Sequence, residues 1–128
     1  MRISLWQCGV VFCIATGLLS GCHDGQNIPG YTVATGGSAQ RGQQVIAQFN
    51  CGKCHTIPGI HDANGVVGPP LNFIARRSII AGNFPNEPNY LVQWIRTPEQ
   101  MKPKTAMPDL GLTEQQARDA AAYLYTLQ

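Results

Sequence analysis

Apolar side chains recur at helical spacing in three stretches between residue 38 and the C-terminus. In the first stretch, residues 39–49, Val45, Ile46 and Phe49 are three or four positions apart or adjacent, as on one face of a helix. Ser38 precedes this stretch and is a suitable N-cap. Gly42 interrupts the helix, either as a tolerated glycine or because another helix crosses it at close range.

A second helix is predicted from Pro88 or Asn89 to Arg96. We expect Asn86 to cap its N-terminus, because a short polar side chain before a helix can accept a backbone hydrogen bond. Pro98 should end the helix, since proline disfavours helical geometry in the residue before it. The inner face of this helix would consist of Leu91, Trp94 and Ile95.

A third helix begins near Thr113, which stands three residues before Gln116 in a match to a capping box. Tyr123 and Tyr125 are the aromatic candidates for the point where this helix meets Gly42. A short helix is predicted from Asn72 to Arg77, and the connecting chain is rich in proline and glycine. The pattern predicts an all-α fold with three main helices, short helices, ordered loops and few or no strands. The apolar stripe of the last helix consists of Ala117, Ala120, Ala121, Leu124 and Leu127.

The first 19 residues combine a positively charged start with a mostly apolar run, which is the layout of a secretory signal peptide. The run ends in Leu19-Ser20-Gly21-Cys22, which resembles a bacterial lipobox. In such signals the chain is cleaved before the cysteine, and we expect the Cys22 thiol to carry a lipid. Ordinary cleavage nearby and an uncleaved anchor are the alternatives. The predicted divisions are a lipoprotein signal peptide (1–21), a flexible tether (22–38) and one domain (39–128).

The net charge of the chain does not alter the expected fold or domain organisation. The chain carries 9 Lys and Arg and 7 Asp and Glu, for a net charge of +2. Removal of residues 1–21 takes away Arg2 and leaves 107 residues with a net charge of +1. This length suits one small domain. The near-neutral balance does not indicate a nucleic-acid-binding protein.

The strongest chemical signal is the C-x-x-C-H motif formed by Cys51, Cys54 and His55. This is the attachment motif of a c-type haem: two thiols can form thioethers with the porphyrin, and the histidine can bind the iron. A zinc site would need a second pair of ligands, and only His61 remains downstream. A thioredoxin-like pair would need a βαβ context, which the pattern lacks. The motif therefore predicts one covalent haem c, with His55 as a metal ligand.

Together these motifs resemble a class I c-type cytochrome, and in particular the cytochrome c domain fused to subunit II of some haem-copper oxidases. The resemblance covers about residues 39–128. Its motifs occur in the order of that family: Gly42 within a helix, C-x-x-C-H, Gly68-Pro69-Pro70-Leu71, Trp94-Ile95, Pro98, the segment from Pro103 to Pro108, and Tyr123-Leu124.

The resemblance implies a role for several further residues around the haem. Met107 would be the second axial ligand and therefore the second metal-binding residue, with Met101 as its rival. The Pro69 carbonyl would accept a hydrogen bond from His55. Leu71 and Trp94 would pack against the ring, and Trp94 could also hydrogen-bond a propionate. The remaining propionate contacts would come from Arg77 or Arg76 and from Thr105.

The expected function is single-electron transfer rather than catalysis, by a lipid-anchored monomer on the extracytoplasmic or periplasmic side of a bacterial cell envelope. The expected partner is a terminal oxidase that receives the electron in a weak, transient complex. An electron acceptor for a membrane dehydrogenase is the alternative within the same class. A haem-based ligand sensor would require a labile sixth ligand, and a small peroxidase would normally need a second haem or distal catalytic groups.

Overall fold

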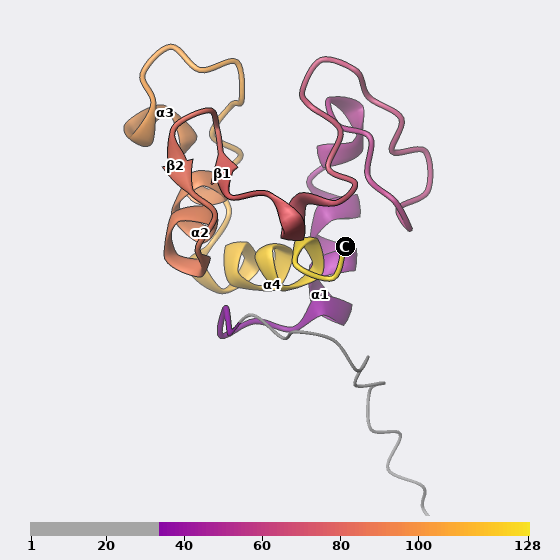
Figure 1. Cartoon of the computed structure of the whole chain (residues 1–128). Helices are drawn as coiled ribbons and strands as arrows, with labels where there is room; N and C mark the ends of the chain where they lie inside the picture. Colours follow the sequence, from indigo (N-terminus) through magenta and orange to yellow (C-terminus); the bar gives the residue numbers. More distant parts are fainter. Residues whose placement is uncertain (1–33) are drawn as a thin grey trace, which may run out of the picture.

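The computed structural model describes residues 34–128, which contain four α-helices (Figure 1). The predicted all-α fold class is confirmed. Two 3₁₀ turns, Cys51–Lys53 and Ile74–Arg76, lie in the connections. Ile79–Ile80 (β1) and Phe84–Pro85 (β2) form a two-stranded antiparallel hairpin, with Ile80 opposite Phe84. The helices are α1 (Ala39–Gln48), α2 (Pro88–Arg96), α3 (Pro98–Met101) and α4 (Glu114–Leu124).

Two of the three predicted helix caps are confirmed. The Ser38 hydroxyl accepts a hydrogen bond from the Arg41 N–H at the start of α1. Thr113 and Gln116 form the capping box that begins α4. The predicted cap of α2 is wrong: Glu87 occupies the N-cap position, and Asn86 binds backbone carbonyls elsewhere. The Asn86 side-chain oxygen, the atom that would cap the helix, instead accepts a hydrogen bond from the Tyr125 hydroxyl at 3.1 Å.

Two smaller expectations also changed in detail. The helix expected within residues 72–77 is reduced to the 3₁₀ turn Ile74–Arg76. Helix α2 ends before Pro98 as predicted, but Pro98 then begins α3, a single further turn. Proline is well suited to this position because a backbone N–H in the first turn of a helix would have no partner within the helix, so its absence costs nothing.

Helices α1 and α4 cross closely enough to explain the glycine in α1 (Figure 1). A Cβ atom at Gly42 would overlap the Asp119 backbone carbonyl and would lie 2.9 Å from the Tyr123 Cβ. The second of the two explanations for Gly42 is therefore correct. Tyr123 lies at the crossing as expected, and its hydroxyl donates to the Pro58 carbonyl at 2.7 Å. The crossing thereby also supports the loop that follows the C-x-x-C-H motif.

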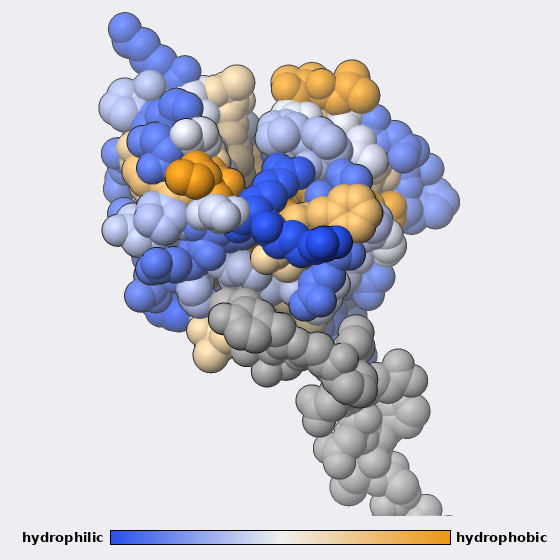
Figure 2. Space-filling view, in the orientation of Figure 1, coloured by the Kyte–Doolittle hydropathy of each residue, from blue (hydrophilic) through white to orange (hydrophobic). Residues whose placement is uncertain are grey.

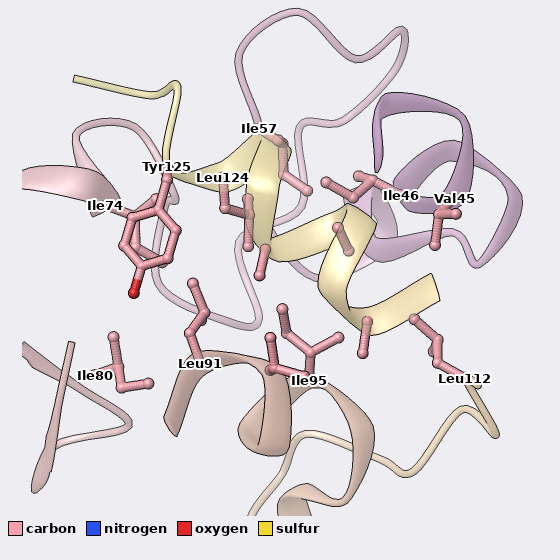
Figure 3. Close-up of a cluster of buried hydrophobic side chains, with 14 of the residues drawn as sticks. Val45, Ile46, Ile57, Ile74, Ile80, Leu91, Ile95, Leu112, Leu124 and Tyr125 are labelled. Atoms are coloured by element: carbon pink, nitrogen blue, oxygen red, sulfur yellow. The ribbon is translucent and has the colours of Figure 1, made fainter. Parts of the chain in front are cut away.

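The core lies between α1, α2 and α4 and is built from branched aliphatic side chains (Figure 3). Figure 3 shows Leu91 and Ile95 of α2 directed toward α4, and Ile46 of α1 on the opposite side of α4. Each such side chain contributes about 1.5–3 kcal/mol when it is removed from water. These contacts hold the three helices together. Ile57, Ile74 and Ile80 extend the core into the connections.

Thr35–Ser38 are bound to α4 by a buried carboxylate. Asp119 is 3% exposed and accepts a bidentate pair of hydrogen bonds from Arg41 at 2.7 and 2.8 Å. It also accepts a hydrogen bond from the Ser38 N–H at 2.7 Å. Thr35 exchanges hydrogen bonds with Arg118 on the same helix. The hydrogen bonds from Arg41 hold the pKa of the Asp119 carboxyl below its usual range.

Three predictions concern residues outside the described part of the chain: the signal peptide, lipidation of Cys22, and the tether up to residue 33. No helix within residues 34–128 has the length and apolar character needed to cross a membrane.

We predict that Asp119→Asn lowers the free energy of unfolding at pH 7 by about 1–3 kcal/mol, because the buried network loses its negative charge and one of its two acceptor oxygens. The folded-state pKa of Asp119 lies below the unfolded value of about 3.9. Its contribution is therefore complete well above pH 4 and is lost as the pH falls through 4 toward the folded-state pKa. Urea unfolding of both proteins at pH 7 and pH 3 measures the difference.

The matched control is Glu99→Gln, which changes an exposed carboxylate on α3. This control should leave the stability nearly unchanged at both pH values. A wild-type advantage over Asp119→Asn that is equally large at pH 3 and pH 7 would contradict the role assigned to the Asp119 charge.

Candidate haem site

A cavity of about 790 Å³ opens between the loop after α1 and the loop after α3. In Figure 1 these two loops stand on opposite sides of the upper part of the molecule, above α4. The volume is within the range of about 300–1,000 Å³ for cofactor and ligand sites. The floor and walls are largely aliphatic and come from the core itself: Ile46, Ile57, Ile74, Ile80, Leu91, Ile95 and Leu124.

The two motif cysteines lie on a single turn at the edge of this cavity. Asn50 adopts a left-handed conformation (φ 55°) that ends the path of α1 and begins the turn. Cys51 and Cys54 both line the cavity, and the Cys54 N–H donates to the Cys51 carbonyl at 3.2 Å. Neither thiol is in a disulfide, and burial raises the pKa of the Cys51 thiol. Two free thiols one turn apart fit thioether attachment to a porphyrin.

The His55 side chain is held by its Nδ1 atom. That atom lies 2.7 Å from the Pro69 carbonyl oxygen, and because a carbonyl can only accept, the proton of this hydrogen bond is on Nδ1. In the neutral ring the Nε2 lone pair is then available to a metal. Gly68 leaves space for the ring, since a Cβ there would lie 2.7 Å from His55 Nδ1. The Gly68 N–H also donates to the Cys54 carbonyl at 2.8 Å.

The remaining predicted site residues, with one exception, line the same cavity. Met107 comes from the loop after α3 and is half-buried. Its backbone N–H donates to the Thr105 hydroxyl at 3.4 Å. Trp94 packs against Phe84 of β2, with ring centroids 6.2 Å apart. The predicted residues that line the cavity are Cys51, Cys54, His55, Pro69, Leu71, Arg77, Trp94, Thr105 and Met107.

The two candidate arginines are separated by the 3₁₀ turn Ile74–Arg76. Arg77 lines the cavity, and its guanidinium donates to the carbonyls of Pro70 and Asn72. Arg76 is exposed and lies outside the cavity wall. Of these two arginines, only Arg77 is therefore placed to meet an anionic group inside the cavity.

Sequence reasoning missed the hairpin and the residue that fixes it. Ile79 and Ile80 line the cavity, although strands were not expected there. The Asn86 amide donates to the Ile74 carbonyl at 2.7 Å and the Arg77 carbonyl at 2.8 Å, and its oxygen accepts from the Tyr125 hydroxyl at 3.1 Å. The adjacent isoleucines followed by Gly82 were the signal that could have indicated a short hairpin.

All charged side chains on the cavity wall, within residues 34–128, are basic: Lys53, Arg77 and Lys102. No group of three or more His, Cys, Asp or Glu side chains gathers within the same residues to form a metal site of its own. An iron held in a porphyrin needs only axial ligands from the protein, and its two propionates would be compensated by basic groups. The residues present therefore fit a covalently attached haem.

Comparison with known proteins agrees with this geometry. Residues 39–128 match the family described as Cytochrome c. The chain is also 32% identical over 91 residues to cytochrome c oxidase subunit 2 of Alkalihalophilus pseudofirmus, a match that covers 70% of this chain and 26% of that protein. The chain thus matches about a quarter of the length of that relative. From the attachment motif, the cavity and the family match together, the chain belongs to the cytochrome c family of electron-transfer proteins and carries covalently attached haem c.

Proposed function

We propose that this protein is a lipid-anchored carrier of single electrons, with His55 and Met107 as the axial ligands of its haem iron and a terminal haem-copper oxidase as its electron acceptor. The observation that carries the proposal is the meeting of both side chains at one cavity, from loops far apart in the sequence. A filled sixth position is what separates a carrier from a ligand sensor.

Haem supplies a reversible one-electron couple at its iron when bound. The protein's own contribution begins with His55, whose hydrogen bond to the Pro69 carbonyl fixes the ring and increases its donor strength. The thioether of Met107 is a soft donor that favours the ferrous state and raises the reduction potential. The aliphatic walls exclude water, which keeps the polar surroundings from rearranging greatly with each change of charge.

The rival ligands are less well placed than Met107. Met101 lies at the end of α3 and is not part of the cavity wall. The His61 side chain is 93% exposed and forms a surface pair with Asp62 at 2.9 Å. Neither residue lines the cavity that holds His55.

The surface around the opening supports a transient partner with acidic groups. Lys53 and Lys102 are exposed residues on the cavity wall, and Arg77 adds a third positive charge. Figure 2 shows apolar patches on the face in view, separated by strongly hydrophilic side chains. A small mixed surface of this kind suits rapid association and release. The relative is itself a subunit of an oxidase, which favours an oxidase over a membrane dehydrogenase as the partner.

The lipid anchor places this carrier on the extracytoplasmic side of a membrane. Leu19-Ser20-Gly21-Cys22 supports cleavage and lipidation at Cys22. A single domain on a short polar tether can stay monomeric and still meet membrane-bound partners, because the tether raises its local concentration.

For the axial ligand, we predict that Met107→Ala keeps the covalent haem but lowers the reduction potential by on the order of 100 mV or more, since the soft donor is lost. The far-red absorption band of oxidised haem bound to thioether sulfur should disappear. Spectroscopic redox titration measures both effects. Met101→Ala is the control and should preserve band and potential; an unchanged potential in Met107→Ala would refute the assignment.

For the anchor, we predict that Cys22→Ala moves the cytochrome from the membrane fraction to the soluble fraction of cells that mature haem c. The Cys13→Ala variant removes a thiol from the same leader but keeps the lipobox cysteine, so it should stay membrane-bound. Fractionation followed by haem staining measures the distribution. Retention of Cys22→Ala in membranes would argue against lipidation as the means of attachment.

A further inference from the structure

The loop that carries Met107 is poorly connected to the rest of the domain. Within the part of the chain that the structure describes, residues 103–111 form hydrogen bonds only among themselves or with Lys102. Most of their side chains are exposed, and Lys104 adopts a left-handed backbone conformation (φ 66°). A segment with so few contacts opens at low energetic cost. The position of Met107 therefore depends on whatever holds Lys102.

Lys102 is held on two sides. Its backbone N–H donates to the Pro98 carbonyl at 2.9 Å, which continues α3, and its carbonyl accepts from the Thr105 N–H at 3.1 Å. Its side chain reaches away from the loop, and the Nζ atom donates to the Ala81 carbonyl at 2.9 Å. This bond joins residues 21 positions apart, and both residues line the cavity. It therefore spans from the Met107 loop to the hairpin.

The hairpin end of this bond is firmly placed. Ala81 and Gly82 lie in the three-residue turn between β1 and β2, both with positive φ (50° and 90°). Phe84 packs against Trp94 and Tyr90 of α2, with ring centroids 6.2 and 6.4 Å apart. The Asn86 N–H closes the base of the hairpin by donating to the Ser78 carbonyl at 3.0 Å. Lys102 thus connects a loosely held loop to an element that is packed on α2.

We propose that Lys102 is a positioning residue for the sixth ligand: its bond to the Ala81 carbonyl holds the Met107 loop closed and slows the release of Met107 from the iron. The inference rests on the proposed His55/Met107 ligation. Thr105 links Lys102 to Met107. Its backbone N–H donates to the Lys102 carbonyl, and its hydroxyl accepts a hydrogen bond from the Met107 N–H. A lysine serving only as surface charge would have no influence on this step.

The test measures how often Met107 leaves the iron. Imidazole added to the oxidised holoprotein can bind only after Met107 has dissociated, so at high imidazole concentration the rate of the spectral change reports the opening of the loop. We expect Lys102→Ala to increase this rate about two- to fivefold, in keeping with the loss of one hydrogen bond from a charged donor at an exposed position. Lys102→Arg retains a cationic donor of similar reach and should restore a rate near that of the wild type.

The matched control is Lys104→Ala, which removes a positive charge from the same loop and no hydrogen bond to another segment. It should leave the imidazole rate unchanged. Equal rates in Lys102→Ala and Lys104→Ala would overturn the positioning role while leaving the ligation intact. A wild-type protein without the far-red thioether band would overturn the ligation, and the positioning role with it. Urea unfolding of each variant shows whether a faster rate reflects general destabilisation, which would also count against a local role.

Discussion

The structure depends on one constraint: the apolar core and the wall of the haem cavity are built from the same side chains. Ile46, Leu91, Ile95 and Leu124 pack against one another and also border the cavity. A domain of this size has little apolar area to spare, so a cavity of about 790 Å³ within its core is costly unless it is filled. Haem therefore completes the core as well as performing the chemistry. Covalent attachment at the cysteines of the turn at residues 51–54, as the C-x-x-C-H motif predicts, would join the cofactor to the turn that follows α1.

The α1–α4 crossing gives this cavity a fixed base. The absence of a side chain at Gly42 allows the close approach, and Asp119 on the opposing helix gathers Ser38 and Arg41 around a buried carboxylate. Tyr123 extends the same helix contact to the loop that follows His55. By contrast, the Met107 loop has few hydrogen bonds of its own. The loop after His55 is thus supported by the best-packed part of the fold, whereas the loop of Met107, the proposed second axial ligand, is joined to the hairpin by the hydrogen bond from Lys102 to the Ala81 carbonyl.

Features encoded by neighbouring residues could be predicted from the sequence. The Ser38 cap, the capping box at Thr113, the course of α2 and the C-x-x-C-H turn all depend on residues a few positions apart. Asn86 shows the limit, because its partners include Tyr125, 39 positions away, and local preference alone suggested a helix cap. The choice between Arg76 and Arg77 depended on how a 3₁₀ turn faces the cavity. The bridge from Lys102 to Ala81 similarly required knowledge of a hairpin that has only two residues in each strand.

Electron transfer as the function, rather than ligand sensing, requires that the sixth position of the iron be filled when no partner is present. Addition of carbon monoxide to the reduced, wild-type holoprotein tests this requirement most directly, because the gas binds readily to an open ferrous site. The account predicts no change in the visible spectrum. A rapid conversion to a carbon monoxide-bound spectrum would contradict it and would favour a sensor with a labile sixth ligand.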